Sequence, residues 1–211
     1  TQETVIRNML VVDEGDPFNE LLNKKSINNI KSSGLFSSVD FKVIESKDQT
    51  HKIMDIFVEE SPSGEISAGA GVGTSGSTIT FGVKEGNFNG KGIKTNTNIN
   101  IGSNTINGGL SFEIPNYKYS NKSLNGNFSR TVTDLLSTSG YKNSSNRVAF
   151  GTAYEQKQNL FFSPTIALNY EKLKTSALAS SALKKQADDY YDMNLDYAVM
   201  YDQRNSTFKP S

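Results

Sequence analysis

Few residues in this chain of 211 residues have the side chains that acid–base, nucleophilic or metal chemistry needs. The chain has no cysteine, which removes thiolate and disulfide chemistry, and its one histidine is His51. A single histidine argues against a histidine-based catalytic triad and against a multi-histidine metal site. His51 is most simply a strand residue exposed to water. No nucleophile–base pair stands out, so we expect no enzyme activity, no cofactor and no bound metal.

Acidic and amide side chains recur near the end of the chain and form a candidate set of ligands for a cation. They are Asp192, Asn194, Asp196 and Asp202, and their oxygen atoms are of the kind that Ca²⁺ and Mg²⁺ prefer. The first three are spaced by two, however, and alternate with large apolar residues, which places them on one face of a β-strand. The hydrated wall of a channel explains such a face without any ion.

The overall charge and hydropathy narrow the class of protein. Lysine and arginine balance aspartate and glutamate, for a net charge of zero, so nothing suggests a nucleic acid partner. No run of about 18 apolar residues is present, and the sequence therefore predicts no transmembrane helix. The low mean hydropathy of −0.49 still allows a membrane β-barrel, because a barrel strand presents only every second residue to lipid.

A change of composition at residues 60–64 predicts a domain boundary there. Charged residues and helical spacing dominate before it, and glycine, asparagine, threonine and serine dominate after it. The elements expected before the boundary are a helix over 1–10, a helix over 19–33 ended by Gly34, and strands over 39–44 and 51–59. A small α+β domain of this order needs a further strand before Thr1, because a two-stranded hairpin is marginally stable by itself.

After the boundary, apolar and polar residues alternate with a period of two. About eight strands are predicted, most of them near the length of about ten residues that a tilted strand needs to cross a bilayer. They cover residues 66–72, 79–84, 93–101, 106–114, 124–131, 147–155, 160–170 and 190–202. A soluble β-sandwich would show the same alternation. Aromatic residues near the strand ends favour the membrane: Phe88, Tyr117, Tyr119, Tyr154, Phe161, Tyr170, Tyr190 and Tyr201.

The alternation also predicts which residues share a face. We expect an outer, lipid-facing surface that carries Ile66, Phe81, Ile99, Leu110, Phe128, Phe150, Ile166 and Leu195. Lys84, Asn98, Glu113 and Asp196 should face inward. The links between strands add an orientation: short links are expected at 89–92, 116–122 and 156–159, and the longest at 134–146 and 174–189. Outer-membrane barrels have short periplasmic turns and longer external loops, which would put the N-terminal part in the periplasm.

Several motifs, in order along the chain, resemble the BamA family of outer-membrane protein assembly factors. The segments Thr4-Val5-Ile6-Arg7, Glu14-Gly15-Asp16 and Gly34-Leu35-Phe36 resemble its POTRA pattern. Its first barrel strand and later turns are matched by residues 69–74, 86–92, 114–117 and 208–211. The resemblance implies that residues 1–60 are a POTRA domain without its first strand. It also implies that residues 64–211 are the first half of an antiparallel transmembrane β-barrel, about eight strands of sixteen.

The resemblance implies a function in assembling and inserting other β-barrel proteins in the outer membrane of a Gram-negative cell. The partners would be client outer-membrane proteins, accessory assembly lipoproteins and outer-membrane lipid. In this family the first and last strands form a weak seam, so the first strand would bind the terminal strand of a client. The residues expected there are Gly64, Glu65, Ile66, Ser67, Ala68, Gly69, Ala70, Gly71, Val72, Gly73 and Thr74. Its glycines could instead serve only curvature or close packing.

The candidate partner-binding residues of the POTRA part are Arg7, Glu14 and Asp16. A solvated face and a helix-breaking turn would account for them equally well. Asn8-Met9 stands where many relatives have Arg-Glu, which puts in doubt a charge contact with a lipoprotein at this point. Two other functions are compatible with the sequence: a POTRA-containing secretion channel or pore of the two-partner secretion type, and a soluble β-rich adhesin.

Overall fold

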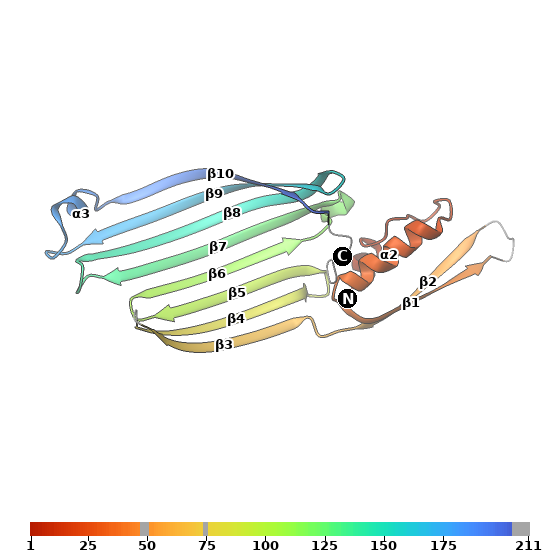
Figure 1. Cartoon of the computed structure of the whole chain (residues 1–211), viewed down its shortest axis with the longest axis horizontal. Coiled ribbons are helices and arrows are strands. Elements are labelled where there is room, and N and C mark those ends of the chain that lie inside the picture. Colours follow the sequence, from red (N-terminus) through yellow and green to blue (C-terminus); the bar gives the residue numbers. More distant parts are fainter. Residues whose placement is uncertain (47–50, 74–75, 204–211) are drawn as a thin grey trace. The chain divides into compact units, whose positions relative to one another are not determined.

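The computed structural model describes residues 1–46, 51–73 and 76–203. They form two compact units (Figure 1). The N-terminal unit comprises Thr1–Gly64 together with Glu85–Ile93, and the second unit comprises Glu65–Lys84 and the chain from Lys94 onward. No helix within the described ranges is long and apolar enough to span a membrane.

The N-terminal unit packs two helices and a hairpin around a small apolar core. Its elements are α1 (Glu3–Arg7), α2 (Glu20–Ser32), β1 (Phe36–Glu45) and β2 (Lys52–Glu60). Asn19 caps α2, because its side chain accepts hydrogen bonds from the N–H groups of Leu21 and Leu22 at 3.0 and 3.2 Å. Gly34, with a φ of +73°, ends that helix. The buried core consists of Val5, Ile27, Ile30, Leu35, Phe36 and Val39.

The first helix is shorter than the sequence predicts. A helix was expected over residues 1–10, but α1 ends at Arg7. The chain then turns, and the N–H of Val11 donates to Ser26 Oγ on α2 at 2.9 Å. This bond and the packing of Met9 and Leu10 against the core replace the last predicted turn of helix. The turn expected between β1 and β2 covers residues 46–50, of which 47–50 lie outside the described residues.

The second unit contains one sheet of eight strands in the order in which they occur in the chain (Figure 1). The strands are β3 (Gly64–Gly73), β4 (Gly76–Phe88), β5 (Ile93–Gly102), β6 (Thr105–Ile114), β7 (Lys122–Leu135), β8 (Tyr141–Lys157), β9 (Leu160–Thr175) and β10 (Asp189–Tyr201). Neighbours from β5 to β10 pair antiparallel. The predicted eight-stranded meander is confirmed. The sheet is open, with β3 and β10 at its two edges.

The links between the strands differ from the prediction in one place. Three short links, at 89–92, 115–121 and 158–159, agree with the expected ones, and the link at 176–188 is long and contains α3 (Ser181–Lys185). The long link predicted at 134–146 is wrong, because only residues 136–140 leave the sheet. The ladder continues up to the pair Leu135 and Tyr141. β7, β8 and β9 are therefore longer at this end than the sequence indicates.

Candidate functional site: two faces and one edge of the sheet

One face of the sheet is largely apolar and exposed from β5 to β10. Strand register puts Leu110 opposite Phe128, Phe128 opposite Val148, and Leu168 opposite Met193, so these residues share a face. The same face carries six of the eight residues predicted to lie together: Ile99, Leu110, Phe128, Phe150, Ile166 and Leu195. Leu195 is 73% exposed and Phe150 is 57% exposed. A continuous apolar surface of this kind is not stable in water and marks a surface that lipid or protein covers.

Two groups of aromatic rings bracket this apolar face along the strands. At one end Tyr170 and Tyr191 stack with ring centroids 4.8 Å apart. At the other end Tyr154 and Phe162 meet edge to face at 6.0 Å. Phe162 and Tyr170 are eight residues apart on β9, which corresponds to about 26 Å along a strand. The apolar band of an outer-membrane barrel is about 25 Å tall and has aromatic girdles at both rims. Phe161 and Tyr190, also expected in these girdles, pair with residues of the opposite, polar face.

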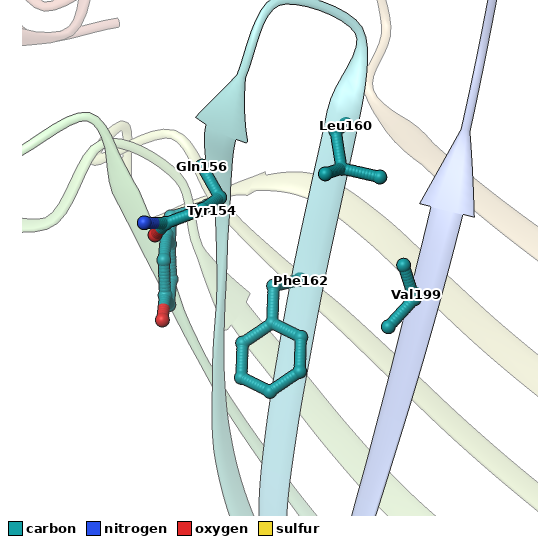
Figure 2. Close-up of a pocket in the computed structure, with 5 residues that line it drawn as sticks. All are labelled: Tyr154, Gln156, Leu160, Phe162 and Val199. Carbon is teal, nitrogen blue, oxygen red and sulfur yellow. The ribbon is translucent and has the colours of Figure 1, made fainter.

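A shallow pocket lies at the second aromatic group (Figure 2). It has a volume of about 360 Å³ and is lined by Tyr154, Gln156, Leu160, Phe162 and Val199. Register places Tyr154, Phe162 and Val199 side by side on the apolar face. The lining is mostly hydrocarbon, and Gln156 adds an amide group. The pocket has the character of a lipid-contact surface rather than of a reaction site.

The opposite face of the sheet is polar and internally bonded. Arg147 Nη2 binds Asp196 Oδ2 at 2.7 Å, and Arg147 Nη1 donates to Asn169 Oδ1 at 3.2 Å. Asn169 in turn donates to Asp192 Oδ2 at 2.7 Å. Two of the three carboxylates singled out in the sequence, Asp192 and Asp196, are thus engaged by neighbours on β8 and β9. Within the described ranges, no group of three or more histidine, cysteine, aspartate or glutamate side chains is placed to hold a metal ion.

Three of the four residues predicted to face inward are placed on this polar face by printed register. Lys94 pairs with Glu113, and Asn98 pairs with Gly109, which shares the face of Glu113. Asp196 pairs with Thr165, and Thr165 pairs with Gly151, so Asp196 lies on the same face. The fourth, Lys84, lies 3.8 Å from Glu65. The sequence did not identify Arg147 as the centre of the network, although its alternation with Val148 placed it on this face.

The first strand of the sheet is its most exposed element. Every residue of β3 is exposed, and Val72 is 88% exposed. Among the strands of the described ranges, β3 pairs only with β4. Two side-chain contacts support that pairing: Glu65 with Lys84 at 3.8 Å, and Ser67 Oγ with the carbonyl oxygen of Gly82 at 3.5 Å. The described part of the predicted client-binding set, residues 64–73, thus lies together on one edge. Thr74, the last member, lies outside the described residues.

The glycines of β3 are not required by packing within the described chain. A Cβ atom added at Gly69, Gly71 or Gly73 would meet no heavy atom within 4 Å, and none of the three has a positive φ. Gly151 on β8 is a clear contrast, because a Cβ there would lie 2.5 Å from Thr165 Oγ1 and 2.8 Å from the carbonyl oxygen of Pro164. Close packing therefore explains Gly151 but does not explain the glycine-rich face of β3.

The turn between β4 and β5 belongs to the N-terminal unit. The N–H of Gln2 donates to the carbonyl oxygen of Gly90 at 2.8 Å, and Asn87 Oδ1 accepts the N–H of Gly92 at 2.7 Å. Gly92 has a φ of +66° and faces Val5, whose Cγ1 would lie 2.9 Å from an added Cβ. The motif at 86–92 is thus explained by a left-handed turn against the start of α1.

The three predicted partner-binding residues of the N-terminal unit do not form one cluster. Arg7 binds Glu3 and Glu14, each at 2.7 Å, and these carboxylates raise the pKa of the Arg7 guanidinium above its ordinary value. Asp16 instead accepts the N–H of Asp13 within a turn, at 2.9 Å. Arg7 and Glu14 lie together, exposed and paired with each other, while Asp16 serves the turn.

An open antiparallel sheet with one apolar and one polar face and an aromatic group at each end is the arrangement of a wall segment of a membrane β-barrel. Residues 87–211 match the Omp85 superfamily domain. The match covers more than half of the chain, and the chain belongs to the Omp85 superfamily. Proteins of this superfamily are β-barrels of the outer membrane that act as insertases or channels. The resemblance to the BamA family seen in the motifs is confirmed at this level.

Solved structures show the same fold. The crystal structure of BamA from Haemophilus ducreyi lacking POTRA domains 1–3 matches with a TM-score of 0.75 and 18% identity, over 100% of this chain and 43% of that one. CdiB from Acinetobacter baumannii matches with a TM-score of 0.59 and 12% identity, over 93% of this chain and 40% of that one. This chain therefore spans less than half the length of either. None of the curated proteins compared with the chain matches it.

Proposed function

We propose that this chain is part of an outer-membrane insertase that assembles other β-barrel proteins. In this proposal residues 1–60 are a POTRA domain lacking its first strand, and residues 64–211 are the first half of a sixteen-stranded transmembrane barrel. The short links lie at the periplasmic end, together with the N-terminal part, and the links at 136–140 and 176–188 are external. The protein uses no enzymatic step, cofactor or metal in this role.

The observation that carries the proposal is that β3 is an exposed strand at the edge of the sheet. An edge strand presents a row of unpaired N–H and C=O groups, to which another strand can pair. In hydrocarbon each unpaired backbone group costs several kcal/mol, so an incoming strand is strongly attracted to such an edge. The exposed edge of β3 therefore supports a template that pairs with the terminal strand of a client by β-augmentation.

The side chains of β3 fit a transient contact. On one face it carries Gly69, Gly71 and Gly73, and on the other Ala68, Ala70 and two larger residues. Small side chains give little cross-strand packing, so the pairing has modest stability and can be exchanged. A seam of this kind opens more easily than the interior of the sheet, where Phe128, Val148 and Leu168 pack as neighbours.

Partner contacts of the N-terminal unit are part of the same proposal. Arg7 and Glu14 form an exposed ion pair on one surface, where an accessory lipoprotein could dock by exchanging one of these charges. Asp16 is a weaker candidate, because its carboxylate already accepts a backbone N–H in the turn. Client outer-membrane proteins and outer-membrane lipid are the other partners.

Site-specific photocrosslinking tests the template directly. A crosslinker at Ala70 in the intact protein should capture the terminal strand of a client stalled during assembly. The same crosslinker at Ile99, exposed on β5 in the interior of the sheet, is the matched control and should capture lipid or nothing. Client crosslinks from the N-terminal helices alone, with none from Ala70, would show that β3 is not the template.

A secretion channel of the two-partner type is the second candidate function. The fold match with CdiB supports it, because the same half-barrel and edge are compatible with a passive pore. Depletion of the protein separates the two functions. Loss of many barrel proteins from the outer membrane is expected for the insertase, and loss of one secreted partner with normal barrel assembly for the channel.

A further inference from the structure

The apolar face of the sheet becomes charged toward the links at 136–140 and 176–188. Arg130 lies two residues beyond Phe128 on β7 and is opposite Asn146, which is opposite Tyr170. Four residues further along, Asp134, Lys142 and Lys174 pair across β7, β8 and β9. We call the charged residues on this part of the face the cationic ledge: Arg130, Asp134, Lys142, Lys172, Lys174 and Asp189.

The cationic ledge has more positive than negative charge. Lys142 Nζ binds Asp134 Oδ2 at 2.7 Å, and Lys172 Nζ binds Asp189 at 2.9 Å. Neither Arg130 nor Lys174 forms an ion pair with another described residue. Four cations and two carboxylates leave a net charge of +2 on the ledge. The ledge therefore has a net positive charge that an anion from outside the chain can neutralise.

The ledge is part of the sheet rather than of a loop. The ladder between β7 and β8 runs without interruption from the Arg130 pair to Leu135 and Tyr141, and that between β8 and β9 reaches Tyr141 and Thr175. Lys142 and Lys174 are neighbours in this ladder and keep a fixed spacing from Arg130, about 13 Å along the strands. A rigid surface fixes the positions of its charges, which a flexible loop would not do.

The depth of Arg130 defines what can bind it. It shares its register row with Tyr170 and Tyr191, the ring pair at one rim of the apolar band. A lipid-facing arginine costs about 2–4 kcal/mol at the middle of a bilayer but only about 0–1 near the interface. Arg130 therefore lies at head-group level, with the hydrocarbon of Phe128, Leu168 and Met193 directly on one side of it.

We propose that the cationic ledge binds the phosphate groups of anionic lipids in the leaflet on the side of the 136–140 and 176–188 links. The inference rests on the membrane barrel of the proposed function. The guanidinium of Arg130 matches two phosphate oxygens with parallel N–H bonds, and Lys174 adds a point charge further from the bilayer. A soluble anion fits the charges alone, whereas a lipid also covers the adjoining apolar face with its acyl chains.

Lipid retention by charge variants tests the inference. The intact protein is reconstituted in vesicles of phosphatidylcholine and phosphatidic acid, extracted in mild detergent, and the lipids retained by each protein are counted by native mass spectrometry. The protein should retain phosphatidic acid in preference to phosphatidylcholine. The double variant Arg130→Gln with Lys174→Gln should reduce that preference roughly thirtyfold, because each of the two basic residues near an anionic surface contributes about 1 kcal/mol. The double variant Lys184→Gln with Lys185→Gln on α3 makes the same charge change off the sheet and should retain lipid normally.

The lipids retained by the unmodified protein and by the variants decide the inference. Equal retention of the two lipids by the unmodified protein overturns the inference, as does a double variant that retains phosphatidic acid like the unmodified protein. Arg130→Lys should keep most of the preference, which separates charge from a loss of folding. Protease protection of the sheet in the same vesicles reports on the barrel itself. A protected, client-assembling protein without lipid preference would refute the ledge and leave the proposed function intact.

Discussion

Arg147 on β8 reaches across β9 to bind Asp196 on β10, with 2.7 Å between Nη2 and Oδ2, although the two residues are 49 positions apart in the chain. Its side chain crosses the strand on which Ala167 is fully buried. Ala149 and Ala167 are paired neighbours on the same face, and their small size leaves room for the long side chain. The bond ties three strands together on the polar face.

Loss of this tie should destabilise the edge of the sheet formed by β9 and β10. Arg147 is one-third exposed and Asp196 about one-half, so the ion pair contributes only about 0–1 kcal/mol, and the packing of the Arg147 stem adds to it. We expect Arg147→Ala to lower the urea midpoint of the folded barrel more than Lys94→Ala does. Lys94 is the control, because its ion pair with Glu113 joins only two adjacent strands. A double-mutant cycle with Asp196→Ala measures the pair, and additive effects would show that the bond carries no coupling.

Glycines on two strands should respond oppositely to one added methyl group. Gly151→Ala places a Cβ against Thr165, Asn125 and the backbone of Pro164, and overpacking of this kind costs about 1–3 kcal/mol. Gly71→Ala meets open space and should change stability by no more than about 0.5 kcal/mol. Equilibrium unfolding in urea compares the two variants directly. Equal destabilisation would mean that β3 is packed against a segment outside this chain.

The turn between β4 and β5 should depend on Gly92. Gly92→Ala forces a left-handed residue with a side chain against Val5, which costs about 1–2 kcal/mol from the backbone conformation alone. Asn87→Ala removes the acceptor of the Gly92 N–H and should have a smaller effect. We expect faster hydrogen–deuterium exchange at Gln2, whose N–H binds Gly90. Gly15→Ala, at another left-handed glycine with nothing within 4 Å, is the control and should leave this exchange unchanged.

Neighbouring residues on β5 should report opposite environments. Ile99 lies on the apolar face, while Asn98 lies on the face of Gly109, and a one-residue slip in register would exchange them. A cysteine at Ile99 should react with a lipid-soluble thiol reagent and a cysteine at Asn98 with a water-soluble one. The chain has no cysteine of its own to interfere. Lipid labelling at Asn98 with none at Ile99 would reverse the assignment of the faces.

The number of strands and the face on which each residue lies could be predicted, because both depend on the alternation of apolar and polar residues within a strand. Each strand carries its own period-two pattern, and neighbouring strands in a meander pair by default, so Phe128 and Ile166 could be placed on one face from sequence alone. The partners of a polar side chain could not be placed in this way. Asp196 meets Arg147 only because the register across β8, β9 and β10 brings them within reach, and no single strand contains that information.

The error at 134–146 has a local cause. The segment is rich in serine, threonine, asparagine and glycine, which is typical of a turn or loop. In the structure Thr131 pairs with Ser145, and Lys142 binds Asp134 at 2.7 Å, so cross-strand contacts override the local preference. Arg130 was missed for a similar reason. It interrupts an apolar pattern, and its place at the rim of the apolar band follows only from the register with Tyr170.

The proposed client-binding role of β3 makes the strongest functional prediction. Pairing through the backbone tolerates changes of side chain, so Ala70→Val in the intact protein should assemble clients at close to the normal rate. Proline at Gly71 or Val72 removes a backbone donor and distorts the strand. One of these two positions points its N–H outward, toward the client, and the other points toward β4, because donors alternate along a strand.

The two proline variants therefore distinguish templating from simple folding. Both substitutions should weaken the pairing of β3 and lower the urea midpoint of the protein. The variant that loses the outward N–H should slow client assembly by more than its loss of stability accounts for. Assembly is measured as the rate at which a client barrel becomes resistant to protease in reconstituted vesicles, with Ala70→Val as the control. Proline variants that are folded and assemble clients at the normal rate would rule out β3 as the template. A loss of assembly in strict proportion to lost stability would assign β3 a structural role instead.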